Sequence, residues 1–516
     1  MKTIAFIFVF VTASLVPAVG KAVIQLPSLI GDNMVLQRSE KIRIWGTADP
    51  GEKITVNFCG QRQATTVGAD RIWHTELAPV AAGGPYEMTI TGQTTLRLTN
   101  ILVGDVWVAA GQSNMQFAVC QLPDAARQIA QSRVAGLRFF TVPPRLALQP
   151  VTEIPGQWVE SNPQNSPWFS AVAYFFARKL NADLNVPVGI IHASWGGTLA
   201  ESWMSLSALQ KDSEFAPILI RQQQEVARYT KLKEESDKAL VKWNTAAEEA
   251  KRQRKPEPTS PVSPVDPAQN PQAPAPAALF NAMIAPLTPY TIRGAIWYQG
   301  EGNASRGYQY RKLLPALIQD WRKAWRQGDF PFLIVQLPNY GAVCSEPGES
   351  TWAELREAQA MALALPRTGL AVTIDLGEAN DIHPKNKQDI GKRLALTAEA
   401  IAYGKKVVYS GPVYQSMRQE GEKVRLQFRH VDGGLLARGR PELQGFAIAG
   451  ADKKFVGAQA KIEGNTVVVW SKQVTHPSAV RYAWADNPVC NLYNQACLPA
   501  SSFRTDDWPG ASINSR

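Results

Sequence analysis

A serine in a tight turn is the first residue of this sequence that could do covalent chemistry. The apolar run VWVAA at residues 106–110 predicts a buried strand, and the glycine that follows it leads Ser113 into a turn. A hydroxyl is a poor nucleophile until a base removes its proton. His383, within NDIHP at residues 380–384, is the best candidate for that base. Together these residues predict acyl transfer through a serine nucleophile.

The same residues also have structural interpretations. A serine at a strand-to-helix turn can cap a helix by accepting a bond from an unpaired backbone N–H, and a histidine before proline can occupy a surface turn. His192 lies at another predicted strand end, where it either lines a pocket or is a buried, hydrogen-bonded residue. The remaining histidines lie in predicted β regions, where structural or solvent-exposed roles are expected: His74, His430 and His476.

Strands separated by helical stretches predict an α/β domain in the middle of the chain. The predicted strands are residues 106–110, 137–142, 188–193, 294–298, 332–336 and 369–375. Three segments follow such strands, at residues 111–115, 192–198 and 297–303. Ligands bind at the carboxyl ends of parallel strands, so these segments and His383 are expected to meet there. Oxyanion donors would be the backbone N–H of Ser113, an N–H of the Gly196-Gly197 turn and the side-chain amide of Gln299.

The rest of the chain divides around this domain. We expect a signal peptide at residues 1–20, a β domain at 21–103, the α/β domain at 104–404 and a second β domain at 405–516. Residues 210–277 interrupt the α/β domain, first with a charged helical pattern and then with a Pro-rich return. We expect this insertion to lie at the surface.

Composition narrows the location and the partners. The signal predicts a periplasmic or secreted protein, and no later apolar run is long enough for a membrane span. The formal charge of +10 falls to +9 when Lys2 leaves with the signal, which suits an anionic substrate, but no nucleic-acid module is recognisable. The five cysteines show no metal-ligand spacing, although Cys490 and Cys497 could bridge a short loop. The sequence gives no indication of the oligomeric state.

Four ordered blocks carry a family resemblance: GQSNM, SWGGT, WYQGE and DIHP, at residues 111–115, 194–198, 297–301 and 381–384. In this order they resemble the sialate O-acetylesterase family of SGNH-type hydrolases, from about residue 26 to residue 507. The resemblance implies a flavodoxin-like, three-layer α/β sheet flanked by β-sandwich-like domains. It also implies an esterase that needs no metal or cofactor and removes acetyl groups from the hydroxyls of a sugar or glycan.

Carried over by position, the resemblance assigns Ser113 as nucleophile, His383 as base, and Ser113, Gly197 and Gln299 as oxyanion donors. SGNH hydrolases commonly place an orienting Asp three residues before the histidine, where this chain has Asn380. Asp381 can orient the ring by its carboxylate or by its backbone carbonyl, or the site is a Ser-His dyad.

Further residues suggest substrate contacts and alternative functions. Trp195 and Glu301 are candidate substrate contacts, and Trp297 and Tyr298 form either a sugar-stacking wall or part of the core. A glycosidase would pair Glu301 with Asp375 or Glu378 across the sugar, which leaves Ser113 unexplained. Acetylated xylan is an alternative substrate, and a non-catalytic glycan-binding protein is an alternative class.

Overall fold

One long strand, β7 (Thr95–Gly111), joins the first β domain to the central sheet. The computed structural model describes residues 23–516, so the predicted signal peptide at residues 1–20 lies outside the described residues. The first half of β7 pairs with β6 (Gly83–Thr91) of the β domain, and its second half pairs with strands of the α/β domain. The predicted boundary between residues 103 and 104 thus falls inside a continuous strand.

The central sheet is mostly parallel. Its order is β13 (Thr368–Ala371), β12 (Phe332–Val335), β11 (Gly294–Tyr298), β7, β10 (Val188–Ser194), β8 (Leu137–Thr141) and β9 (Trp158–Glu160). Only the β8–β9 pair is antiparallel within this path. All six predicted strands are present, and their apolar runs are buried, as expected for strands covered on both faces.

The strand order differs from the expected flavodoxin-like order. There the second parallel strand lies beside the first, whereas here β10, the third, lies between β7 and β8. Apolar periodicity indicates where strands are but not which strands become neighbours. The chain still reverses direction across the sheet at β7, because its connection to β8 goes one way and the connection from β10 to β11 goes the other. This switch point is where ligands are expected.

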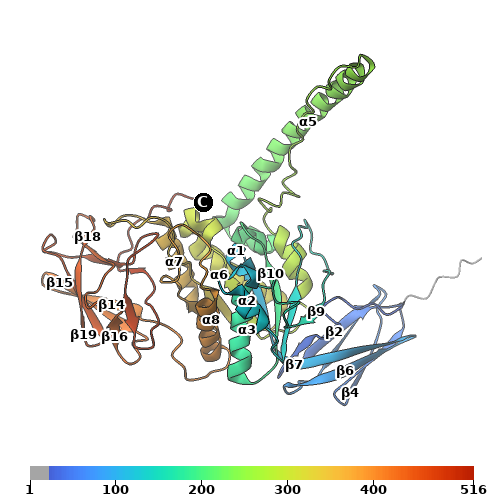
Figure 1. The fold of residues 1–516 in the computed structure, drawn as a ribbon, viewed down its shortest axis with the longest axis horizontal. Coiled ribbons are helices and arrows are strands. Elements are labelled where there is room, and N and C mark those ends of the chain that lie inside the picture. The colour runs from blue at the N-terminus through green and yellow to red at the C-terminus, as the bar shows by residue number, and fades with distance from the viewer. Residues whose placement is uncertain (1–22) are drawn as a thin grey trace, which may run out of the picture.

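Helices cover both faces of the sheet (Figure 1). The ring of Trp107 packs on Phe176 of α3 with centroids 5.2 Å apart, while Trp297 packs on Trp321 of α6 at 5.8 Å. The helices are α1 (Ser113–Gln116), α2 (Ala125–Ala130), α3 (Ala171–Leu184), α4 (Leu206–Lys211), α5 (Ala216–Arg252), α6 (Gly307–Trp325), α7 (Thr351–Met361) and α8 (Lys387–Ile401). The expected three layers are therefore present.

The flanking domains are β structures, as predicted. The first contains β1 (Val35–Gln37), β2 (Ile42–Thr47), β3 (Lys53–Phe58), β4 (Gln61–Thr66), β5 (Ile72–Leu77) and β6. The second contains β14 (Val413–Glu420), β15 (Lys423–Arg429), β16 (Leu435–Ala437), β17 (Phe446–Ala449), β18 (Val456–Gly457), β19 (Gln459–Glu463), β20 (Thr466–Trp470), β21 (Ala479–Tyr482), β22 (Leu492–Asn494) and β23 (Phe503–Arg504). Cys490 and Cys497 are both free thiols, so the structure contains no bridge between them.

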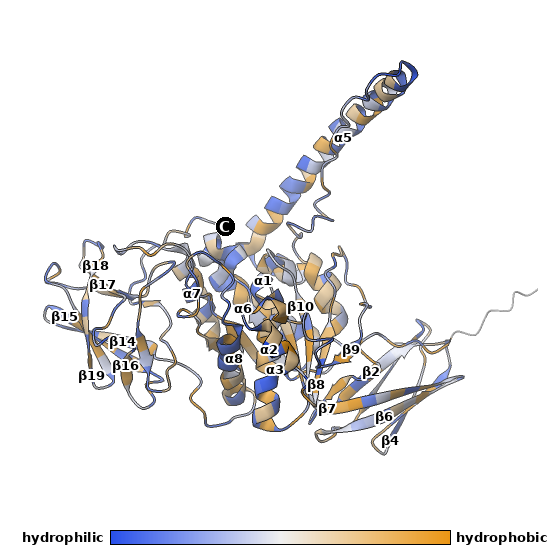
Figure 2. Cartoon of the chain, viewed as in Figure 1, coloured by the Kyte–Doolittle hydropathy of each residue, from blue (hydrophilic) through white to orange (hydrophobic). Residues whose placement is uncertain are grey.

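The predicted insertion forms an arm. Helix α5 projects from the body, and the Pro-rich segment runs back along it (Figure 1). Ile218, near its base, is the buried residue of this 37-residue helix. The hydropathy of the arm agrees with its exposure to solvent. The arm is largely hydrophilic, whereas the central strands are hydrophobic (Figure 2). No helix within residues 23–516 has the length and apolar character needed to cross a membrane.

Candidate active site

The turn after β7 places Ser113 at the carboxyl edge of the sheet. Gly111 has a φ of +138°, and a β-carbon there would lie 2.1 Å from the carbonyl oxygen of Tyr298, so only glycine fits. Gln112 then anchors the turn, because its Oε1 accepts N–H bonds from Gly300 (3.3 Å) and Gly302 (3.2 Å). Ser113 is the first residue of α1, and Gln112 occupies the cap position. The alternative in which Ser113 caps the helix is therefore wrong.

His383 faces Ser113. Its Nε2 lies 2.9 Å from Ser113 Oγ, within hydrogen-bond distance, although 270 residues separate the two in sequence. The His383 side chain is 35% exposed, so the pair lies at the edge of the solvent. Partial burial lowers the pKa of His383 below its ordinary value, and the positive charge of Lys387 lowers it further. A neutral imidazole is the form that can accept the serine proton.

Asp381 contacts His383 in two ways. Its Oδ1 accepts the backbone N–H of His383 at 2.8 Å and lies 3.4 Å from Nδ1 of the ring. Its Oδ2 accepts a bond from Lys385, and this bond, together with the His383 backbone N–H, lowers the pKa of Asp381. The carboxylate of Asp381 thus approaches Nδ1. That approach is longer than an ordinary hydrogen bond.

Of the two glycines after β10, Gly196 lies against Ser113. A β-carbon at Gly196 would be 3.2 Å from Ser113 Cβ, and the Gly196 N–H already donates to Gln116 Oε1 at 2.8 Å. Gly197 is exposed and has a φ of +75°. Within residues 23–516, neither the Gly197 N–H nor the Ser113 N–H has a hydrogen-bond acceptor. Of the glycine pair, Gly197 is thus the one with an N–H that remains available.

Gln299 is placed differently from the expectation. It is fully buried, and its Nε2 donates to Thr198 O at 3.1 Å and to Asn303 Oδ1 at 2.7 Å. Its Oε1 accepts the hydroxyl of Tyr310 at 2.8 Å. Because both amide hydrogens are already engaged, Gln299 holds the loop after Gly197 in place and has no N–H left for an oxyanion.

The predicted substrate contacts differ in burial and in hydrogen bonding. Trp195 is half-buried, and its backbone N–H donates to Gly111 O at 3.0 Å, which keeps the Trp195 backbone beside the turn that carries Ser113. The Glu301 carboxylate points inward, because Oε1 accepts from Asn114 at 2.6 Å and Oε2 is buried. Trp297 and Tyr298 are fully buried and belong to the core. Trp195 therefore remains a predicted substrate contact, whereas the Glu301 carboxylate is engaged inside the protein.

Other candidate residues have structural roles. His192 is buried, its Nε2 lies 2.5 Å from Ser194 Oγ, and burial lowers its pKa to about 4. Asp375 forms a bidentate pair with Arg393 at 2.6 and 2.7 Å, so it is not free to act opposite Glu301 in a glycosidase. Glu378 accepts the Lys385 N–H at 2.9 Å. Across residues 23–516 no group of three or more His, Cys, Asp or Glu is arranged to hold a metal ion.

Two residues at the site were missed by the sequence analysis, namely Asn114 and Lys387. Both are fully buried, and Lys387 Nζ donates to Asn114 Oδ1. Asn114 also donates from Nδ2 to Ile382 O at 2.9 Å, which joins the residue after Ser113 to the residue before His383. The available signal was a polar Asn inside the GQSNM block and a Lys at the start of the helix after His383.

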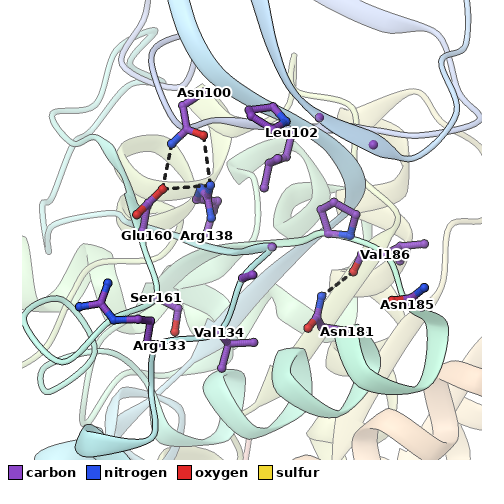
Figure 3. A pocket seen from close by; sticks show the side chains of 16 residues that line it. Asn100, Leu102, Arg133, Val134, Arg138, Glu160, Ser161, Asn181, Asn185 and Val186 are labelled. Atoms are coloured by element: carbon purple, nitrogen blue, oxygen red, sulfur yellow. Dashed lines mark hydrogen bonds and ion pairs between the residues drawn. The ribbon is translucent and has the colours of Figure 1, made fainter.

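One cavity lies away from Ser113. It has a volume of about 720 Å³ and is lined by Asn100, Arg138 and Glu160 together with Gly136 and Pro187 (Figure 3). Gly136 and Pro187 precede β8 and β10, so this cavity lies at the amino edge of the parallel strands. Ser113 lies at the opposite edge.

Comparisons with known proteins agree on one class. Residues 275–399 match the family model described as carbohydrate esterase, sialic acid-specific acetylesterase. The sialate O-acetylesterase of Rattus norvegicus is 32% identical over 432 residues, which cover 75% of each chain. That of Homo sapiens is 28% identical over 539 residues, which cover 94% of each chain. The structure of a carbohydrate acetylesterase from Xanthomonas citri aligns with a TM-score of 0.80 at 38% identity, covering 94% of this chain and 100% of that one.

The fold and these similarities define a carbohydrate esterase, which is a carboxylic ester hydrolase. The mixed α/β fold with additional β-sheet domains is confirmed by the same structural match. More narrowly, the chain belongs to the sialate O-acetylesterase family.

Proposed function

We propose that this protein is a secreted esterase that hydrolyses O-acetyl esters of sialic acid, or of another acetylated glycan, through a serine–histidine acyl-enzyme mechanism. The observation that carries the mechanism is the 2.9 Å contact between Ser113 Oγ and His383 Nε2. The names of the relatives support the substrate class, and the positive net charge, +9 once Lys2 leaves with the signal, suits an anionic sugar. Secretion rests on the apolar N-terminal segment of the sequence.

The first half of the reaction forms the acyl-enzyme. Ser113 Oγ attacks the acetyl carbonyl carbon while His383 Nε2 takes the hydroxyl proton. The carbonyl oxygen becomes an oxyanion, and the N–H groups of Ser113 and Gly197, which have no other acceptor within residues 23–516, would stabilise it. When the tetrahedral intermediate collapses, the imidazolium gives its proton to the departing sugar oxygen. The acetyl group then remains on Ser113 and the sugar leaves as an alcohol.

The second half returns the enzyme to its starting state. His383 removes a proton from water, and the resulting hydroxide adds to the acetyl carbon. Collapse of the second intermediate releases acetate and restores the Ser113 hydroxyl with the proton held by His383. Asp381, at 3.4 Å from Nδ1, favours the tautomer in which Nε2 faces Ser113.

The test compares the wild type with Ser113→Ala on two substrates, O-acetylated sialic acid and acetylated xylan. We expect the wild type to release acetate faster from the sialic acid, and Ser113→Ala to lower both rates by about 1,000-fold or more. Ser416→Ala, on an exposed position of β14, is the matched control and should keep full activity. Circular dichroism verifies that each variant is folded.

Three results would contradict the proposal in different ways. Unchanged turnover in Ser113→Ala removes the mechanism. Faster release from xylan moves the substrate to a neutral polysaccharide. New reducing ends would indicate a glycosidase, because ester hydrolysis produces none.

A further inference from the structure

Behind the nucleophile lies a cluster of polar side chains that the reaction steps do not use. It consists of Asn114, Glu301 and Lys387, from α1, from the 3-10 helix η6 (Glu301–Arg306) and from the first position of α8. Asn114 and Lys387 are fully buried, with 0% of their surface accessible to solvent. Glu301 Oε2 is buried and has no hydrogen-bond partner in the described part of the chain. Burying such groups is costly, so their arrangement calls for a reason.

Asn114 joins the other two groups, and chemistry fixes how its amide is turned. An ammonium can only donate and a backbone carbonyl can only accept, so Lys387 must face Oδ1 while Ile382 O must face Nδ2. The second hydrogen of Nδ2 goes to Glu301 Oε1 at 2.6 Å. The amide is therefore fully used. Turning it over would place a donor against the ammonium of Lys387.

The bond from Asn114 to Ile382 reaches the catalytic pair. Ile382 immediately precedes His383, and Asn114 immediately follows Ser113. The 2.9 Å bond between them therefore fixes the backbone of the base relative to the backbone of the nucleophile. Lys387 holds Asn114 in the orientation that this bond needs.

The ammonium of Lys387 sits between aromatic rings. It lies 4.8 Å from the ring centroid of Phe117 and 5.4 Å from that of Tyr298, distances typical of cation–π contacts. Burial lowers the pKa of Lys387 to about 7, while the negative charges of Glu301, Asp381 and Glu378 oppose that shift. The positive charge of Lys385 lowers the pKa of Lys387 further.

The charge of Lys387 also acts on His383. Among the charged groups around the imidazole, Lys387 and Lys385 lower the pKa and Asp381 raises it, and Lys387 has the larger effect of the two lysines. The nearby cation thus makes protonation of the ring less favourable.

We propose that Lys387 is a positioning residue of this esterase, which through Asn114 holds His383 against Ser113 and by its positive charge opposes protonation of the base. The proposal rests on the serine–histidine mechanism proposed above. It gives the buried Asn114–Glu301–Lys387 cluster two separable effects, one on geometry and one on charge.

Two substitutions separate these effects. Lys387→Gln keeps an N–H donor and removes the charge, whereas Lys387→Met removes both. The experiment measures kcat and KM for nitrophenyl acetate between pH 4 and pH 9. The same two substitutions at Lys392 are the controls, because Lys392 lies on the same helix with an exposed side chain paired to Asp389 at 3.3 Å. Thermal melts verify that each variant is folded.

We expect the acid limb of the kcat/KM profile to move to higher pH by about half a unit or more in both Lys387 variants, because the base loses a neighbouring positive charge. Lys387→Met should also lower kcat by about 10-fold or more with little change in KM, because the His383 backbone is no longer held. The Lys392 variants should match the wild type. If Lys387→Met does not fold, the position of the acid limb in the kcat/KM profile of Lys387→Gln is the test of the proposal.

An acid limb at the wild-type position in Lys387→Gln would overturn the inference, whatever happens to the rate. That failure can be told apart from failure of the mechanism. If Ser113→Ala is inactive and the Lys387 profile is unchanged, only the role of Lys387 is wrong.

Discussion

At the scale of single residues, His383, the proposed base, shares the carboxylate of Asp381 with other groups. Asp381 accepts the His383 backbone N–H at 2.8 Å and also binds Lys385, while its side chain is 35% exposed. In serine hydrolases with a buried carboxylate, loss of that group costs about 10,000-fold in kcat. A solvent-exposed carboxylate 3.4 Å from Nδ1 stabilises the imidazolium less, because water screens it.

We therefore expect Asp381→Asn to lower kcat by about 10- to 100-fold, less than in a buried triad. Steady-state kinetics on nitrophenyl acetate provide the measurement. Asp389→Asn, at an exposed carboxylate on α8, is the control and should leave kcat unchanged. Full activity in Asp381→Asn would assign the site as a Ser-His dyad, and a loss near 10,000-fold would show that the carboxylate acts as a buried one does.

At the scale of elements, the site forms where three strand ends meet. Strands β10, β7 and β11 are neighbours, and the segments after them carry Gly197, Ser113 and Glu301. The strand ends can come together because the turn after β7 lies very close to β11. Gly111 pairs with Tyr298, and a β-carbon at Gly111 would lie 2.1 Å from the Tyr298 carbonyl oxygen.

Gly111→Ala should destabilise the fold by about 2 to 4 kcal/mol and abolish most of the activity, because the turn must move away from β11. Denaturant unfolding and acetate release measure the two effects. Gly421→Ala is a matched control, since Gly421 also has a positive φ, of +62°, but no neighbour within 4 Å of an added β-carbon. It should cost about 1 kcal/mol and leave the rate unchanged. Equal behaviour of the two variants would mean that the close approach is not needed.

At the scale of the whole molecule, the two β domains are built into the body whereas the arm is not. The first β domain shares strand β7 with the central sheet. The second is tied to the body by Tyr493, whose hydroxyl donates to Asp375 at 3.0 Å, and by Arg504, which pairs with Glu357 of α7 at 2.9 Å. Beyond Ile218, the side chains of α5 are partly or largely exposed.

Replacing residues 226–265 by a short Gly-Ser linker should therefore leave the melting temperature within about 2 °C and keep turnover of nitrophenyl acetate, because little apolar surface is exposed by the cut. Calorimetry and steady-state kinetics measure both quantities. A fall of the melting temperature by about 5 °C or more would show that the arm supports the body.

The sequence determined the parts of this protein that depend on local pattern. Apolar runs located all six strands of the α/β domain. The backbone conformation of a helix or strand fixes the direction of each side chain. The repeat of apolar residues along the sequence therefore indicates which side chains are buried, even when the elements that pack against them are unknown. Because parallel strands end at one edge, the segments carrying Ser113, Gly197 and His383 could also be expected to meet.

Tertiary structure alone decided which atoms meet at that edge. Strand neighbours, and with them the departure from the flavodoxin-like order, follow from packing of the whole sheet. Gln299 turned inward because Thr198, Asn303 and Tyr310 satisfy its amide. Asn114 and Lys387 are 273 residues apart and became partners only inside the fold. A buried polar group takes whatever donor or acceptor the fold brings within about 3 Å, and no local pattern in the sequence records that choice.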